Sequence, residues 1–133
     1  YYLILMDEIK NKINNKIKEL YNRINQLNYS KKNIKFYYSE KIKDIKEEIK
    51  DLNAQYIYYS NVNQTNQIDL HGATRYFINF YIDDLIYEKI QNFETVIIIT
   101  GKGSFVLFYH LKKHLILYNY PFTINNYIFT ITK

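Results

Sequence analysis

Apolar residues in the first sixty positions recur at helical spacing. They stand three or four residues apart, with charged residues or Asn between them, at Ile13, Ile17, Leu20, Ile24 and Leu27. After a polar stretch at 30–35 the same spacing returns at Tyr38, Ile42, Ile45, Ile49, Leu52 and Tyr56. Such spacing is typical of helices with one apolar seam. We therefore predict a helical hairpin over residues 1–60.

The pattern changes after the polar segment 61–66, which we interpret as a linker ahead of a domain at 67–133. In that domain, short apolar runs at 67–71 and 94–100 predict two strands. The second run, ETVIIIT, is continuously β-branched, so we expect this strand to be buried on both faces.

A predicted helix follows each of these two strands. Thr74 is placed to cap the first helix, the second begins near Ser104, and Pro121 ends it. The expected buried faces are Ile78, Tyr81, Ile82, Leu85, Ile86 and Ile90 in the first helix, and Leu107, Phe108, Leu111, Leu115 and Tyr118 in the second. The tail predicts two further strands that meet at Asn125-Asn126.

The predicted order is therefore β-α-β-α-β-β. Right-handed crossovers make the first two strands parallel neighbours and place both helices on one face. We expect an α/β (α+β) two-layer sandwich preceded by the helical hairpin.

Glycine usage identifies the turns that bear on function. Lys, Asn, Ile and Tyr supply 70 of the 133 residues, and a base-composition bias explains that excess, because all four have A/T-rich codons. The three glycines are Gly72, Gly101 and Gly103, and they follow the first two predicted strands. Ligands of open parallel sheets bind at this end of the strands.

The residues beside these glycines suit phosphodiester chemistry. Asp69 and His71 are two apart on a strand, so their side chains share a face and form an acid/base pair. The loop Gly101-Lys102-Gly103 offers backbone N–H groups and an ammonium that suit a phosphate. Lys102 would offset charge that builds on the phosphoryl oxygens. A structural interpretation stays open, in which Asp69 caps the helix and His71 is an ordinary turn residue.

Other polar residues of the second predicted helix give weaker signals. His110 and His114 are four apart, as metal ligands often are, but no Glu lies between them, and we expect a solvated flank with no metal. Lys112 and Lys113, with Arg75 on the first helix, fit contacts to a nucleic-acid backbone and equally fit plain surface.

Two segments resemble the paired signatures of the Smr (small MutS-related) domain: Ile68-Asp69-Leu70-His71-Gly72 with Thr74, and Thr100-Gly101-Lys102-Gly103-Ser104. The match covers 67–133, and the segment 52–57 is similar to the helical region that often precedes eukaryotic Smr domains. The resemblance implies a sandwich like the C-terminal domain of bacterial translation initiation factor three. It also implies a nucleic-acid-binding domain, many members of which nick DNA or cleave RNA.

By position, the resemblance assigns catalysis to Asp69 and His71 and backbone binding to the loop Gly101-Lys102-Gly103. Because it would offset charge on the phosphoryl oxygens, Lys102 is the third expected catalytic residue. The residues expected to bind nucleic acid are Gly72, Thr74, Arg75, Gly101, Lys102, Gly103, Ser104, Lys112 and Lys113. The chain departs from the family pattern at Arg75, Ile78, Phe108 and Asn125-Asn126. These departures affect substrate contacts rather than the acid/base pair.

We therefore expect an intracellular endonuclease that nicks or cleaves DNA or RNA, with DNA repair and RNA binding as its expected settings. The alternative is a module that binds branched or single-stranded nucleic acid without cleaving it, within a larger repair or ribosome-associated protein. That alternative is favoured by charge, because residues 67–133 hold 6 basic and 5 acidic side chains although the whole chain carries +5. Participation of Mg²⁺ or Mn²⁺ stays open, since one acidic residue is few for a two-metal site.

The residue types that the sequence lacks exclude several classes of site. With no cysteine, disulfides, thiolate zinc sites and cysteine nucleophiles are excluded, and no apolar run reaches the roughly 18 residues of a membrane span. Because the first residue is Tyr1, we expect a segment of a longer chain.

The hairpin is either a nucleic-acid-binding arm or a structural element that self-associates or binds a partner helix through residues 7–60.

Overall fold

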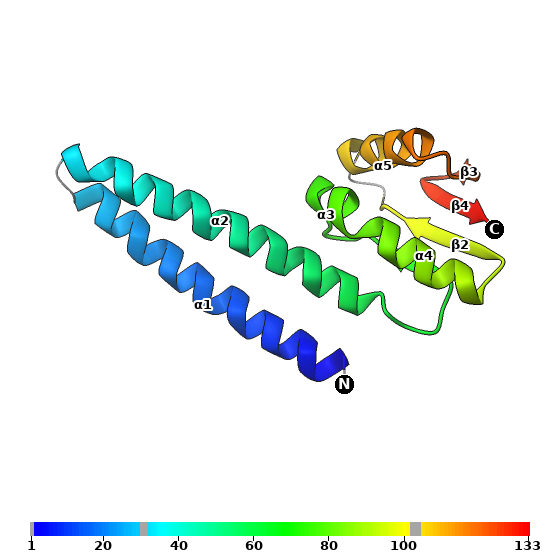
Figure 1. The fold of residues 1–133 in the computed structure, drawn as a ribbon, viewed down its shortest axis with the longest axis horizontal. Coiled ribbons are helices and arrows are strands. Elements are labelled where there is room, and N and C mark those ends of the chain that lie inside the picture. The colour runs from blue at the N-terminus through cyan, green and yellow to red at the C-terminus, as the bar shows by residue number, and fades with distance from the viewer. Residues whose placement is uncertain (1, 30–31, 102–104) are drawn as a thin grey trace. The chain divides into compact units, whose positions relative to one another are not determined.

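A computed structural model describes residues 2–29, 32–101 and 105–133 of the chain, which divides into two compact units, Tyr1–Tyr56 and Ile57–Lys133. The first unit holds helix α1 (Tyr2–Tyr29) and most of helix α2 (Lys32–Ser60), side by side as the predicted hairpin (Figure 1). An ion pair from Lys16 to Glu48 joins the two helices. Of the predicted seam, Ile42 and Ile45 are buried, whereas Ile17 is exposed.

The second unit is an α+β domain. Its elements are β1 (Gln67–Asp69), α3 (Arg75–Phe80), α4 (Ile82–Asn92), β2 (Thr95–Ile99), α5 (Phe105–Leu117), β3 (Phe122–Asn125) and β4 (Ile128–Thr132). Two helices connect the first two strands, where the sequence predicts one. The break falls at Tyr81, whose φ of −129° is not helical and whose ring stacks on Phe77 with centroids 5.9 Å apart.

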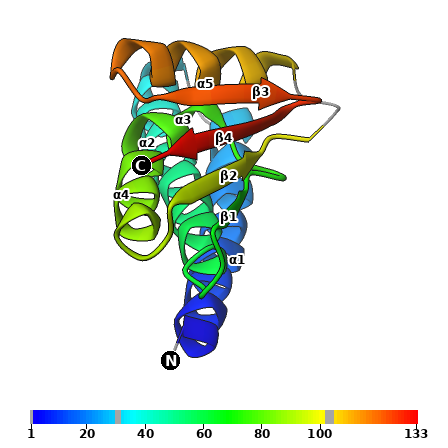
Figure 2. The same ribbon diagram turned by 90° about the vertical axis from the view of Figure 1, so that its right-hand side faces the viewer.

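The four strands form one mixed sheet in the order β1-β2-β4-β3 (Figure 2). β1 and β2 are parallel neighbours, as predicted, and β4 pairs antiparallel with both β2 and β3. Figure 2 shows the strands in front of α3, α4 and α5. The inner face of the sheet is buried at Ile68, Val96, Ile98, Phe129 and Ile131.

The expectation that the second strand is buried on both faces is wrong. Val96 and Ile98 are buried, but Ile97 and Ile99, on the other face, are only half-buried. β2 is central because it has a neighbouring strand on each edge. Figure 2 shows the helices of this unit on a single face of the sheet. A β-branched run therefore marks a central strand here rather than a strand between two helical layers.

Two predicted features at the end of α5 also differ from the structure. The helix ends at Leu117, and Asn119 follows with a left-handed φ of 60°, so Asn119 and not Pro121 ends the helix. Tyr118, expected in the core, is exposed. None of the helices in the described ranges combines the length and the apolar character that crossing a membrane requires.

The segment 61–66, interpreted as a linker, packs within the second unit. The Asn61 side chain is buried, and the ammonium of the buried Lys89 donates to Asn63 Oδ1 (3.1 Å) and to the Thr65 carbonyl oxygen (2.8 Å). Burial lowers the pKa of Lys89. This polar segment is thus tied to helix α4.

Candidate functional site

β1, β2 and β3 finish at the same end of the sheet, and the predicted site residues that the structure describes at 69–72 and 101 lie at that end. The register places Asp69 beside Ile99, and Ile99 beside Ile128. The Leu70 N–H donates to the Ile99 carbonyl oxygen at 2.8 Å, which continues the β1–β2 pairing by one residue. The residues that follow β1 and β2 therefore share one edge with the β3–β4 turn, and this edge is the candidate site.

Asp69 and His71 are exposed on this edge, while Leu70 between them is fully buried. Among the described residues no side chain, that of Asp69 included, makes a cap hydrogen bond at the start of α3. Instead the Asp69 Oδ1 accepts a hydrogen bond from the His71 backbone N–H at 2.9 Å, and the Ala73 N–H donates to the Leu70 carbonyl oxygen at 2.9 Å. These bonds form a tight turn that holds the carboxylate beside His71.

Backbone conformation explains two of the three glycines. Gly72 has φ +79° and Gly101 has φ +84°, a region that disfavours side chains. Apart from the glycine and its two chain neighbours, no atom of the described residues lies within 4 Å of the position that a Cβ would take at either glycine. The glycines are therefore required by φ rather than by a close approach, and the space beside each is open. Lys102, Gly103 and Ser104 lie outside the described residues.

Asn61 positions Asp69, a role that no pattern in the sequence indicates. The Asn61 Oδ1 accepts the Asp69 backbone N–H at 2.8 Å, and its Nδ2 donates to the Asp69 carbonyl oxygen at 3.1 Å and to the Ile57 carbonyl oxygen at 2.9 Å. β1 is the outer strand of the sheet, so the backbone groups of Asp69 point away from β2. The buried amide of Asn61 satisfies them as a neighbouring strand would.

We expect Asn61→Ala to lower the free energy of unfolding of the second unit by about 2 kcal/mol, because the variant leaves the Asp69 backbone without its hydrogen-bond partner. Guanidinium denaturation of the full chain measures this. Gln64→Ala, at an exposed position in the same polar segment, is the matched control and should change little. Equal stability of the two variants would show that Asn61 does not hold β1.

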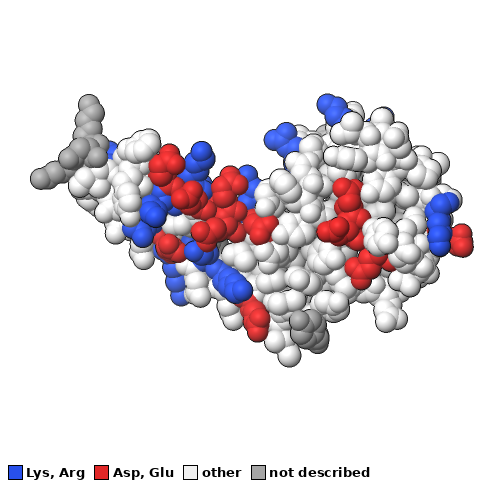
Figure 3. Space-filling view, viewed as in Figure 1, with Lys and Arg blue, Asp and Glu red and all other residues white. Residues whose placement is uncertain are grey.

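The remaining predicted nucleic-acid contacts occupy α3 and α5. Thr74 stands at the N-cap of α3 without a side-chain cap bond among the described residues, and Arg75 follows it, exposed. On α5, Lys113 is exposed and Lys112 is half-buried. Figure 3 shows positive side chains along the α5 margin of the second unit and acidic ones over the start of α4, where Asp83 and Asp84 lie.

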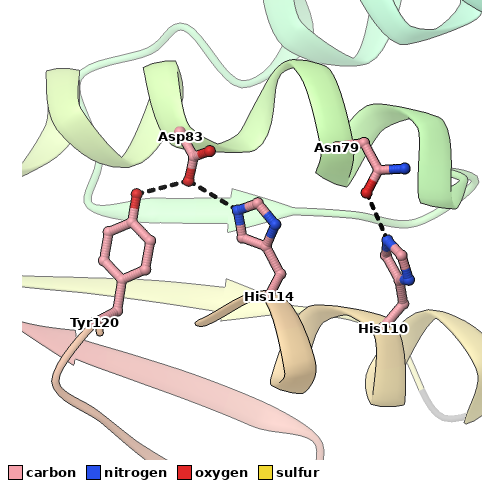
Figure 4. A network of polar contacts seen from close by, with 5 residues as sticks. All are labelled: Asn79, Asp83, His110, His114 and Tyr120. Atoms are coloured by element: carbon pink, nitrogen blue, oxygen red, sulfur yellow. Dashed lines mark hydrogen bonds and ion pairs between the residues drawn. The ribbon is translucent and has the colours of Figure 1, made fainter. Parts of the chain in front are cut away.

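The two histidines of α5 do not form a solvated flank, contrary to the sequence-based expectation. His114 is buried, and its Nε2–H donates to Asp83 Oδ1 at 2.9 Å; the same oxygen accepts the Tyr120 hydroxyl at 2.6 Å (Figure 4). His110 Nε2 donates to Asn79 Oδ1 at 2.7 Å. Burial and the Asp83 carboxylate raise the pKa of Tyr120. The histidines thus join α5 to α3 and α4.

His110 makes stability depend on pH. Burial, and then the positive charges of Arg75, His114 and Lys113, lower the pKa of His110 below its usual value. Its contribution is therefore complete above about pH 6.5 and is lost as the pH falls through the lower folded-state pKa, because the unfolded chain takes up the proton first.

We expect the stability advantage of the wild-type chain over His110→Gln to shrink between about pH 7.5 and about pH 5. Glutamine keeps a donor for Asn79 but does not titrate, so the difference isolates His110. Thermal unfolding of both proteins across this range measures it. A difference that stayed constant or grew on acidification would contradict the lowered pKa.

The structure places no group of three or more His, Cys, Asp or Glu residues together as metal ligands within the described ranges. Asp69 and His71 therefore form a two-residue site as far as the described side chains go. Comparison of the chain with protein-family models, with curated proteins and with solved structures found no match.

Proposed function

We propose that the second unit is a nucleic-acid endonuclease of the Smr type, in which Asp69 and His71 are the acid/base pair. The observation that carries this proposal is their position: both are exposed at the end of β1, and the end of β2 lies beside them and is followed by Gly101, with open space at both glycine turns. A phosphodiester lying across this edge would meet a carboxylate, an imidazole and backbone N–H groups together.

In the proposed reaction, Asp69 takes a proton from the attacking oxygen, which is a 2′-hydroxyl in RNA or a water molecule. His71 gives a proton to the leaving oxygen. The hydrogen bond from the His71 N–H to Asp69 Oδ1 fixes the carboxylate relative to the imidazole-bearing residue. Lys102 keeps its predicted role in offsetting charge on the phosphoryl oxygens.

Positive charge for binding would come from the helices. Arg75 of α3 and Lys113 of α5 each lie close enough to His110 to lower its pKa. Arg75 follows the Gly72 turn by three residues. Such contacts would hold the backbone without reading sequence.

One observation favours a second function, recognition without cleavage. The second unit is nearly neutral, with 6 basic and 5 acidic residues in 67–133, and acidic side chains gather over the start of α4 on the face in Figure 3. A general duplex binder is usually more basic. In this alternative the same edge holds branched or single-stranded nucleic acid.

The test is cleavage of end-labelled RNA hairpins and of supercoiled plasmid by the purified chain, with and without Mg²⁺ or Mn²⁺. Cleavage that is lost in both Asp69→Ala and His71→Ala supports the endonuclease, and the substrate that is cut distinguishes RNA from DNA. Salt-sensitive binding without cleavage supports the recognition module. Neither binding nor cleavage would overturn both functions.

A further inference from the structure

A row of aromatic side chains leads from the core of the second unit to the candidate site. Phe129 of β4 is fully buried, and Phe108 of α5 packs on it with ring centroids 5.1 Å apart. The Tyr127 ring lies 5.4 Å from that of Phe108, and the Phe105 ring lies 5.9 Å from that of Tyr127. Phe105 is 56% exposed. The aromatic row, Phe129, Phe108, Tyr127 and Phe105, is thus anchored at one end and open to solvent at the other.

The open end of the aromatic row lies at the same end of the sheet as Asp69. Phe129 is level with Ile98 on the face that the helices cover, whereas Asp69 is level with Ile99 and Ile128 on the other face. The Thr100 hydroxyl donates to the Tyr127 carbonyl oxygen at 3.2 Å, which ties the β3–β4 turn to the residue before Gly101. Figure 2 shows the end of β2, the start of α5 and this turn at the same end of the sheet. Neighbouring strands are about 4.8 Å apart, so the end of β1 and the start of β4 lie roughly 10 Å from each other, with β2 between them.

Tyr127 occupies a backbone conformation that disfavours a side chain. Asn126 and Tyr127 have φ of 49° and 65°, and they form the two-residue loop between Asn125 and Ile128, which are paired. The second position of such a loop is usually Gly, because both central residues need positive φ. A glycine would make the same turn without crowding, whereas Tyr127 holds a ring at the edge of the sheet. Strained side chains of this kind cluster at functional sites.

We propose that Phe105 and Tyr127 stack an unpaired base of a nucleic acid whose backbone crosses the candidate site at Gly101. The proposal rests on the proposed function for the position of the backbone, and it narrows the substrate class to single-stranded or unpaired nucleotides. Bases inside a duplex already stack on one another, and an exposed aromatic ring competes only for a base that is free. Stacking is indifferent to sugar type, so both RNA and DNA fit.

The experiment compares the affinity of the full chain for labelled strands of roughly 12 nucleotides, measured by fluorescence anisotropy. The probes are single-stranded RNA, single-stranded DNA, the DNA duplex, and an abasic strand with the same number of phosphates. We expect Phe105→Ala to weaken binding of the base-containing single strands by about 5- to 100-fold and to leave the abasic strand unaffected. Phe105→Trp should restore binding.

Two further variants separate stacking from damage to the fold. Tyr87→Ala removes a ring that is 68% exposed on α4, and it should leave all affinities unchanged. Tyr127→Gly should weaken single-strand binding, and glycine suits the positive φ, which offsets part of the stability lost with the ring contact to Phe108. Unchanged single-strand binding by Tyr127→Gly would count against the proposal.

The proposal is overturned if the wild-type chain binds the abasic strand as tightly as the base-containing strands, if it binds neither, or if Phe105→Ala leaves their ratio unchanged. These outcomes are independent of cleavage. Cleavage that requires Asp69 but an affinity ratio that ignores Phe105 would keep the proposed function and refute stacking. A Phe105-dependent affinity ratio without any cleavage would keep base stacking and refute the endonuclease. Comparing the RNA and DNA strands distinguishes the two sources of the base.

Discussion

Replacing Asp69 with asparagine is expected to slow nucleic-acid cleavage by about 10²- to 10⁴-fold while leaving the affinity for the substrate unchanged. The asparagine Oδ1 can still accept the His71 N–H that Asp69 accepts at 2.9 Å, so the turn after β1 is kept. The amide cannot take up a proton, so the base is lost. Single-turnover rates on whichever substrate is cleaved, with anisotropy for binding, measure the two quantities separately.

The matched control is Gln67→Ala, because Gln67 is exposed on the same face of β1 two residues earlier. It should cleave at the wild-type rate. His71→Ala should lose a similar factor, and free imidazole added to that variant should restore part of the rate if His71 acts as the acid. Wild-type cleavage by Asp69→Asn, or a loss of binding that accounts for the lost rate, would show that Asp69 has a structural role.

Phe129→Ala is expected to lower the free energy of unfolding of the second unit by about 3–5 kcal/mol. Phe129 is fully buried and contacts the rings of Phe108 and Phe122, with centroids 5.1 and 5.9 Å away. β4 is hydrogen-bonded to strands on both edges, so its backbone cannot move inward to fill the space.

Hydrogen exchange of the β2 and β4 amides reports the stability of the second unit separately from the hairpin. The control is Phe80→Ala, which removes a ring that is 64% exposed on α3 and should change stability by less than about 0.5 kcal/mol. A loss of under about 1 kcal/mol in Phe129→Ala would mean that the core tolerates a cavity at the base of the aromatic row.

Features that depend on local periodicity could be predicted from the sequence. The spacing of Ile42 and Ile45 gave the buried seam of the hairpin, and the short apolar runs gave the parallel pair β1 and β2. The scarcity of glycine pointed to Gly72 and Gly101, and both have the positive φ that a side chain resists. The catalytic roles of Asp69 and His71 stay predictions.

Features that depend on distant partners could not be predicted. The break at Tyr81 leaves the apolar spacing of Ile78 and Ile82 intact, and both remain buried, so periodicity does not register it. His114 is buried by a contact with Asp83, 31 residues earlier, which spacing within α5 does not contain. Asn61 stands in a polar run that reads as a linker, and only the fold brings it to Asp69.

The hydrogen bonds of Asn61 also bear on how the chain avoids β-strand pairing between molecules. A bare outer strand is a template for strand addition by another molecule, which leads to domain swapping and fibrils. At β1 that template is short, and the Asn61 amide occupies the backbone groups of Asp69. β3 is the outer strand at the opposite edge of the sheet, and within the described residues it pairs only with β4. In the sheet that the structure describes, any intermolecular β-pairing would therefore begin at β3, and loss of Asn61 would create a second starting point.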